Sequence, residues 1–353
     1  ATPTASMRSG KATANVDMSM GSEIIRQAAT NNSENVVIAP KVTGSVTKAE
    51  VSIPASTVGQ IRSRTNASLT IATPVADLTV PNGGLDSLSG ASGTVTVTAE
   101  KTGSTVELSI TAGGRAVTNV PGGVTLTVPV SYTTPGTVAV LVHDNGTQEV
   151  VRKSVADNGS VTIPLDGSVK LEIVDNSKYF ADVPSTSWAA DAVAFVSAHE
   201  LLNGTSADQF SPDLPMSRGM LATVLHNLER NPYQPIAGVF ADVNSGAWYA
   251  EGVSWAAANG IVTGYGGGQF GPNDNITREQ LAVILWRYAG SPAAANRELY
   301  FSDAYKASDW ALEALRWAIQ NGIINGKGNG ILDPTGQATR AETAQVLKNY
   351  MNR

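Results

Sequence analysis

The chain has 353 residues, a formal net charge of −6 and no cysteine. This length suits two domains, and the negative charge argues against nucleic acid as a partner. No run of about 18 consecutive apolar residues is present, so we expect no membrane span. The chain begins Ala1-Thr2-Pro3 with neither a methionine nor a signal peptide, which is typical of a processed or truncated form.

Residues 1–178 are predicted to form one β-rich domain. Glycine, threonine, serine and valine dominate it, and apolar and polar residues alternate in short runs, such as 94–98, 106–110 and 124–128. Alternation with a period of two is typical of half-buried strands. Turn dipeptides separate the runs at 113–114, 145–146 and 158–159. Many short strands with regular turns indicate a mainly antiparallel sandwich or barrel.

Three local features complete this domain. Residues 22–29 are its one long helical pattern. Residues 51–61 resemble residues 78–88 at an offset of 27, which predicts two successive units of a strand and a short helix. Residues 138–142 and 149–151 flank a turn with Asn145-Gly146 and predict a hairpin. We place the domain boundary near residues 175–178.

The second half of the chain contains three copies of one pattern. Its landmarks shift by 60 residues from the first copy to the second and by 61 or 62 to the third. They are Phe180, Phe240 and Phe301; Asp182, Asp242 and Asp303; Trp188, Trp248 and Trp310; Gly204, Gly264 and Gly326; and Arg218, Arg278 and Arg340. A fixed period marks a repeat architecture in which no unit buries its apolar face alone. The repeats span 179–232, 239–290 and 300–353.

Each copy predicts a helix, a glycine-rich loop and a second helix. In the second copy a helical apolar stripe begins at Trp248 and ends at Asn259-Gly260, because glycine after a helix closes the last carbonyls. The second helix restarts with Thr277 as N-cap and Gln280 completing a capping box. We therefore expect an all-α domain with Trp188, Trp248 and Trp310 buried, since aromatic residues at helical spacing usually pack.

Two sets of charged residues stand out in the repeats. Arg218, Arg278 and Arg340 each lie in the first turn of a helix, where a cation opposes the helix dipole at a cost of a few tenths of a kcal/mol. An anionic ligand, or an aspartate from a neighbouring repeat, would offset this cost. Asp182, Asp242 and Asp303 precede the first helices. They could cap amide groups, contact a ligand, or do both.

The order Phe-x-Asp-Val, Trp, Gly-Ile-x-x-Gly, Gly-x-Phe-x-Pro and Ile-Thr-Arg-Ala-Glu resembles the S-layer homology domain of Gram-positive and some other bacteria. This resemblance covers residues 180–353. It implies a pseudo-threefold bundle that binds a secondary cell-wall polysaccharide, typically a pyruvate-bearing one, in grooves between repeats. It also implies an extracellular location in the cell wall or S-layer, with the β-rich domain displayed outward. The candidate ligand-binding residues are Arg218, Arg278, Arg340, Asp182, Asp242, Asp303, Thr277, Thr339, Glu342, Gly204, Gly264 and Gly326.

The three copies are unequal. The third keeps the full motif with Glu342, the second has Gln280 in place of the acid, and the first has Gly219 and Met220. We expect Glu342 to cap or brace the helix start that carries Arg340, so that Arg340 or Arg278 contributes more to binding than Arg218. We also expect folding to survive loss of any of the three, as for a solvated arginine at a helix start.

Nothing in the sequence predicts catalysis, a metal or a cofactor. The three histidines have no metal-ligand spacing, and no nucleophile elbow or phosphate loop is present. The leading hypothesis is a non-catalytic wall anchor. One alternative is a structural protein whose β-rich domain self-associates, or assembles with another surface protein, into a layer or filament. Another is the C-terminal piece of a larger surface enzyme.

Overall fold

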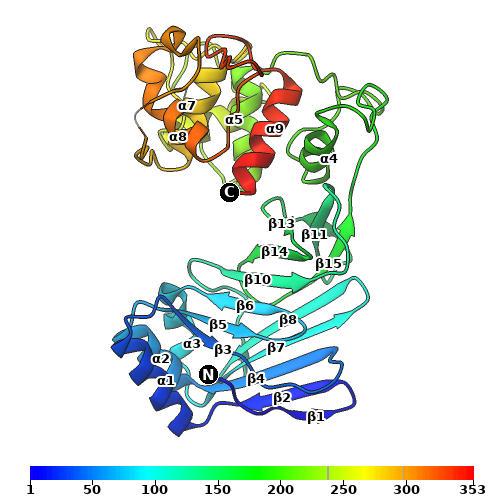
Figure 1. Cartoon of the computed structure of the whole chain (residues 1–353), viewed down its shortest axis with the longest axis vertical. Helices are drawn as coiled ribbons and strands as arrows, with labels where there is room; N and C mark the ends of the chain where they lie inside the picture. The colour runs from blue at the N-terminus through cyan, green and yellow to red at the C-terminus, as the bar shows by residue number, and fades with distance from the viewer. Residues whose placement is uncertain (237, 297) are drawn as a thin grey trace. The chain divides into compact units, whose positions relative to one another are not determined.

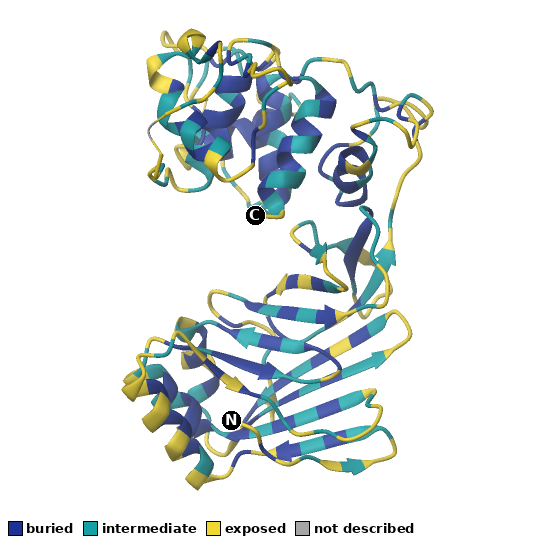
Figure 2. Ribbon diagram, in the orientation of Figure 1, coloured by how far each residue is buried: buried dark blue, intermediate teal, exposed yellow. Residues whose placement is uncertain are grey.

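The structure is a computed structural model that describes residues 1–236, 238–296 and 298–353. The chain divides into two compact units, Ala1–Asn176 and Ser177–Arg353 (Figure 1). Each unit has its own cluster of buried apolar residues, and buried and exposed positions alternate along the strands of the first (Figure 2).

The N-terminal unit contains two sheets. The larger has the order β1 (Ser6–Arg8), β2 (Lys11–Asn15), β4 (Lys48–Pro54), β7 (Thr94–Thr102), β8 (Thr105–Ala112), β15 (Val169–Asp175), β11 (Thr137–Val142) and β12 (Gln148–Val150), with β9 (Arg115–Ala116) paired to β8. The smaller has the order β13 (Val155–Asp157), β14 (Ser160–Leu165), β10 (Val124–Pro129), β6 (Asp77–Val80), β5 (Ser68–Ala72) and β3 (Asn35–Ile38). All pairs between these strands are antiparallel except β2–β4 and β3–β5, so the mainly antiparallel prediction is confirmed.

The local predictions for this unit are also confirmed. Helix α1 (Met18–Thr30) covers the predicted helix, and Asp17 caps it by accepting from the amide of Met20. The repeat of 27 residues corresponds to β4 followed by α2 (Ala55–Arg64), and to β6 followed by η1 (Asn82–Leu85) and α3 (Asp86–Ser89). Strands β11 and β12 form the hairpin around Asn145-Gly146.

The strands at the ends of both sheets are short. Strands β1, β12 and β13 have three residues each and β3 has four. The residues after β3 are also paired, because Ala39 N donates to Ala1 O and Lys41 N to Pro3 O. Short or covered edges offer few backbone groups to another chain, so the edges do not favour assembly by strand addition.

The C-terminal unit contains three helix-loop-helix repeats. The helices are α4 (Ala190–Ala198), α5 (Arg218–Leu228), α6 (Ala250–Ala258), α7 (Arg278–Tyr288), α8 (Leu312–Gln320) and α9 (Arg340–Met351), with short turns η2 (Ala304–Lys306) and η3 (Asp309–Ala311). The second helix of each repeat packs on the first helix of the next: α5 on α6, α7 on α8, and α9 back on α4. The three repeats therefore close into one core.

Three backbone hydrogen bonds join the loops of the repeats in a closed ring. Met216 N donates to Ala338 O at 2.9 Å, Ala338 N to Ile276 O at 2.9 Å, and Ile276 N to Met216 O at 2.8 Å. All three side chains are fully buried. No repeat can complete this ring alone, so the ring depends on all three copies.

The prediction that the repeated tryptophans are buried is wrong. Trp188, Trp248 and Trp310 are 66%, 63% and 57% exposed. Each lies in the turn just before a helix rather than on its apolar stripe, so its side chain faces solvent and the next residue turns into the core. Those next residues are Ala189, Tyr249 and Ala311. The buried tryptophans are Trp255 and Trp317, inside α6 and α8.

Candidate ligand-binding grooves

The three repeated arginines are buried rather than solvated. Arg218, Arg278 and Arg340 are only 5%, 5% and 3% exposed. Each follows an N-cap whose hydroxyl accepts from the backbone three residues on, and the predicted capping boxes of Thr277 with Gln280 and Thr339 with Glu342 are present. The expectation of a solvated side chain at a helix start is therefore wrong.

Each arginine ties its own repeat to the next by two hydrogen bonds to backbone carbonyls. Nε of Arg218, Arg278 and Arg340 donates to Phe270 O at 2.9 Å, Leu332 O at 2.9 Å and Phe210 O at 2.8 Å. Nη2 donates to Thr263 O at 2.9 Å, Asn325 O at 2.7 Å and Asn203 O at 2.6 Å. Burial lowers the pKa of all three guanidinium groups. These carbonyls stabilise the buried cations, so a ligand is not required to explain them.

The repeated aspartates hold the same loops from the other side. Asp182 accepts from Phe210 N and Ser211 N at 2.9 and 2.6 Å. Asp242 accepts in the same way from Phe270 N and Gly271 N at 2.8 and 2.7 Å, and Asp303 from Leu332 N and Asp333 N at 2.8 and 2.9 Å. These bonds lower the pKa of Asp303; at Asp242 burial opposes them, and the pKa is still lowered. The aspartates therefore cap loop amides within their own repeat, not helix starts.

The repeated glycines leave room for the repeated phenylalanines. A Cβ at Gly204, Gly264 or Gly326 would lie 2.6, 2.9 or 2.6 Å from the ring of the phenylalanine that opens the same repeat. It would also lie within 2.4–2.7 Å of a backbone carbonyl oxygen. The aspartate and the glycine of one repeat, together with the arginine of the repeat before it in the ring, position the loop between the two helices. We call this set of three residues, which occurs three times, the loop clamp.

A groove opens beside the loop clamp that contains Arg218. It has a volume of about 330 Å³ and is lined by residues of all three repeats. The lining residues are Arg218, Thr263, Gly264, Tyr265, Gln280, Val283, Ile284, Arg287 and Trp310. The Arg218 guanidinium lies 4.5 Å from the centre of the Tyr265 ring, and Arg287 Nη1 donates to Thr263 Oγ1 at 3.2 Å.

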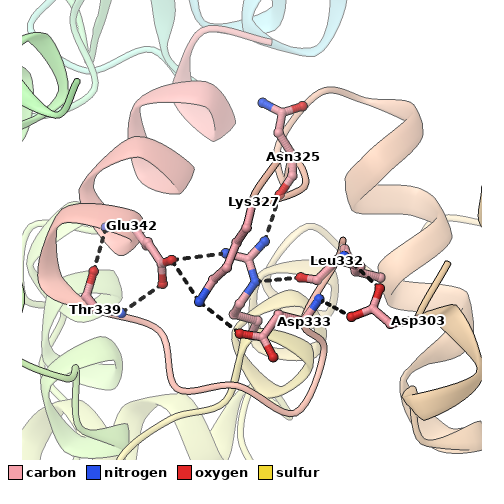
Figure 3. Close-up of polar contacts among 8 residues, drawn as sticks. Asp303, Asn325, Lys327, Leu332, Asp333, Thr339 and Glu342 are labelled. Carbon is pink, nitrogen blue, oxygen red and sulfur yellow. Dashed lines mark hydrogen bonds and ion pairs between the residues drawn. The ribbon is translucent and has the colours of Figure 1, made fainter. Parts of the chain in front are cut away.

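A second groove, of about 450 Å³, lies at the equivalent place beside Arg278. It is lined by Trp188, Arg278, Ile323, Asn325, Gly326, Lys327, Glu342, Gln345, Val346 and Asn349. Lys327 Nζ lies 2.9 Å from Asp333 Oδ2 and 3.2 Å from Glu342 Oε1, as Figure 3 shows. Glu342 is also 3.8 Å from Arg278 Nη1.

Each groove combines an arginine from one repeat, a loop and helix from the next, and a tryptophan from the one after. The same order of repeats makes Arg340 of the third repeat, Gly204 of the first and Trp248 of the second the residues that correspond to these groove residues. Glu342 caps the start of α9 as expected, because Thr339 N donates to its Oε2 at 3.1 Å. Its Oε1 lies 3.8 Å from Arg278 Nη1, a partner in another repeat that the sequence did not reveal. Thr277 and Thr339 act as N-caps, and neither is among the residues that line the two grooves.

Sequence reasoning did not nominate the tryptophans as groove residues. Their helical spacing from later apolar residues suggested a core position, and only their place before the helix start could have signalled otherwise. It also did not nominate Tyr265, Arg287 and Lys327, because these positions differ between the repeats and no pattern marks them.

Comparison with known proteins identifies the repeats. The S-layer homology domain family matches residues 179–219, 239–282 and 300–344. The chain is 29% identical over 251 residues to an amylopullulanase of Thermoanaerobacterium thermosulfurigenes, covering 67% of this chain and 13% of that protein. It is 29% identical to the exoglucanase XynX of Acetivibrio thermocellus (51% and 17% covered) and 26% identical to the S-layer protein sap of Bacillus anthracis (54% and 23% covered).

The chain thus spans less than a quarter of the length of these relatives. The amylopullulanase match is longer than the C-terminal unit, so it extends into the β-rich unit. Within the described residues, no helix has the length and apolar character needed to cross a bilayer, and no cluster of three metal-ligating side chains is found.

Proposed function

With three S-layer homology domains, this chain is a cell-surface protein attached to the cell wall, and we propose that its C-terminal unit binds a secondary cell-wall polysaccharide. Three repeats around a pseudo-threefold axis would offer three related sites. The β-rich unit would be the cargo that these sites hold at the surface, so that residues 1–178 and 179–353 are separate domains with separate tasks.

The observation that carries this proposal is that each of the two grooves is lined by both an exposed tryptophan and a buried arginine. An exposed aromatic ring gives the apolar face of a sugar a surface to pack on. The arginine uses Nε and Nη2 for backbone carbonyls, and its remaining N–H groups can bind a carboxylate. Grooves of this kind suit an acidic or pyruvylated sugar, and Gly264 and Gly326 are among their lining residues.

We propose that the β-rich unit takes no part in wall binding. Tyr132 is its one aromatic residue, so it has no set of rings for stacking on sugars. Its salt bridges, such as Lys11–Glu50 and Lys48–Glu100, pair lysines with acids across neighbouring strands and leave no strip of positive charge there. We propose that this chain itself is not an enzyme.

Two alternatives remain open. Some relatives are named as S-layer proteins and others as an amylopullulanase or an exoglucanase. Assembly into a layer is one possibility, although the short sheet edges count against strand addition. The other is that this chain is part of a larger surface enzyme, which the amylopullulanase match favours because it extends beyond the repeats.

The test is sedimentation of the full chain with purified Gram-positive cell walls, before and after acid extraction of their secondary polysaccharide. We expect the chain to sediment only with untreated walls. A polypeptide of residues 1–176, shown to be folded by circular dichroism, should stay in the supernatant. Sedimentation of that polypeptide with comparable affinity would place the anchor outside the repeats.

A further inference from the structure

The turn before the first helix of the third repeat is longer than its two counterparts. Trp188 and Trp248 each follow the repeated aspartate by six residues, whereas Trp310 follows Asp303 by seven. The extra residue lies within 304–309, the segment that contains η2 and the start of η3. Trp310 nevertheless lines one groove, as Trp188 lines the other. The longer turn therefore presents its tryptophan to the same kind of groove.

The two shorter turns are held by hydrogen bonds of their own. In the first repeat Ser187 N donates to Pro184 O at 2.8 Å. In the second, Asn244 accepts twice, from Gly246 N at its Oδ1 and from Ala247 N at its carbonyl oxygen, both at 2.9 Å. These bonds join residues two or three apart and fix the backbone that leads into the tryptophan.

The longer turn is held by a buried carboxylate of the second repeat. Glu279, in the first turn of α7, is only 4% exposed. Its Oε2 accepts from Ser308 N at 2.9 Å, and its Oε1 accepts from Ser308 Oγ at 3.0 Å. Ser308 is the N-cap of η3 and stands two residues before Trp310. Both carboxylate oxygens thus fix the backbone that leads into this tryptophan.

Neither of the other repeats has a carboxylate at the position of Glu279. The corresponding residues are Gly219 and Ala341. A Cβ at Gly219 would lie 2.9 Å from a backbone carbonyl oxygen and 3.3 Å from the Tyr249 side chain, so a long side chain has no room there. The third repeat has Ala311 in place of Tyr249. The carboxylate and the longer turn therefore occur together, at one of the three junctions between repeats.

We propose that Glu279 is a positioning residue of the wall-binding unit, because it fixes the longer turn so that Trp310 lines the groove beside Arg218. The inference rests on the proposed function, since the position of the ring affects binding only where the groove holds the polymer. Among the described residues, Glu279 is not one that lines this groove, so it acts through Trp310 and not on the ligand. Breaking its bonds should weaken one groove and leave the other unchanged.

The experiment changes Glu279 in the full chain in two ways. Glu279→Ala removes both acceptors of Ser308. Glu279→Gln keeps the pair, because the amide oxygen can accept from the backbone and the amide nitrogen can donate to the hydroxyl. Glu251→Ala is the matched control, since it removes an exposed acid from the first turn of α6. Circular dichroism checks the helix content of each variant.

Nuclear magnetic resonance of the indole N–H groups reads the two grooves separately. Trp310 reports the groove beside Arg218, and Trp188 reports the groove beside Arg278. Single changes of tryptophan to phenylalanine assign the signals. Spectra are recorded first without ligand, and then during titration with the polysaccharide that acid extraction releases from the cell walls.

In Glu279→Ala we expect the Trp310 signal to move or broaden before any ligand is added. Its titration midpoint should rise about two- to tenfold, as for the loss of an aromatic contact. The Trp188 midpoint should stay within about twofold of the parent value, as for a distant site. Glu279→Gln and Glu251→Ala should match the parent at both signals. A general loss of stability would affect both tryptophans alike, so the difference between them identifies positioning.

A second variant keeps the test decisive if Glu279→Ala fails to fold. Residues 304–309 are replaced by the five residues 243–247, so that the third turn can close on itself as the second does. In this background Glu279→Ala should leave the Trp310 midpoint unchanged. If it raises the midpoint as much as in the parent, Glu279 does not act through the turn and the inference is wrong.

Two results separate the inference from the proposed function. If the parent chain sediments with walls but Glu279→Ala leaves the Trp310 signal and midpoint unchanged, the inference is wrong and wall binding stands. If the parent chain fails to sediment with untreated walls, the proposed function is wrong, and the Trp310 signal without ligand still decides whether Glu279 positions the ring.

Discussion

The loop clamps and the groove linings of the C-terminal unit have opposite patterns of variation. The clamp residues are identical in all three repeats, and each makes the same contacts to backbone or ring atoms. The lining positions differ: Tyr265 corresponds to Lys327, and Gln280 to Glu342. The identical residues therefore make the packing that closes the ring, and the residues that differ line the grooves.

The largest expected effect tests the clamp. Changing Arg340 to alanine would remove a buried side chain, leave the buried carbonyl of Phe210 without its donor, and remove the bond to Asn203 O. We expect a loss of about 3–5 kcal/mol in the free energy of unfolding of the C-terminal unit. Urea denaturation followed by tryptophan fluorescence measures it, because every tryptophan of the chain lies in this unit.

Arg218→Ala and Arg278→Ala should behave similarly, since their burial and partners match those of Arg340. If each of the three variants lost less than about 1 kcal/mol in free energy of unfolding, as for an exposed residue, the clamp would contribute little to stability. The arginines would then be explained by ligand binding alone.

A smaller effect is expected at the clamp glycines. In Gly326→Ala the new Cβ would lie 2.6 Å from the Phe301 ring and 2.7 Å from Ile331 O. Such overpacking costs about 1–3 kcal/mol. Gly246→Ala is the matched control, because its nearest atom would be 3.6 Å away, and it should change the denaturation midpoint little.

The clamp aspartates predict a dependence on pH. The folded pKa of Asp303 is lowered by the amides of Leu332 and Asp333. A carboxylate with a lowered folded pKa stabilises the protein above its unfolded pKa, near 4, and this stabilisation is lost as the pH falls through the folded value. Asp303→Asn should therefore lower stability at pH 7 and lose less on acidification to pH 3 than the parent does. Parallel urea curves at the two pH values would decide this.

A gain in stability is expected at Thr343. Its side chain is fully buried, and its hydroxyl has no partner among the residues that the structure describes. The equivalent positions hold Leu221 and Leu281. Thr343→Val keeps the shape and removes an unsatisfied polar group, so we expect a gain of about 1 kcal/mol. An unchanged or lower midpoint in thermal denaturation would indicate a partner for this hydroxyl.

The repeats could be predicted from the sequence because they depend on local signals. Asn259-Gly260 ends α6, and Thr277 with Gln280 starts α7, as the helix-capping rules require. The burial of Arg278 could not be predicted in this way. Its partners, Leu332 O and Asn325 O, lie in the next repeat, and backbone carbonyls leave no mark in a sequence.

The same limit explains the error about Trp310 and the pairing of Glu342 that the sequence did not reveal. Periodicity predicts which side of a helix is buried, but Trp310 precedes helix α8 and is not part of its apolar stripe. The pairing of Glu342 with Arg278 depends on how the repeats close around the ring, which a motif within one repeat does not specify. Where the residues of one groove come from three repeats, their grouping is a property of the fold.

The most direct test of the account replaces Trp188, Trp248 and Trp310 together by alanine. Each ring is more than half exposed, so the triple variant should fold with a free energy of unfolding close to that of the parent. It should nevertheless stay in the supernatant when mixed with walls that sediment the parent chain. A folded triple variant that sediments as well as the parent would contradict the central claim that the grooves bind the wall.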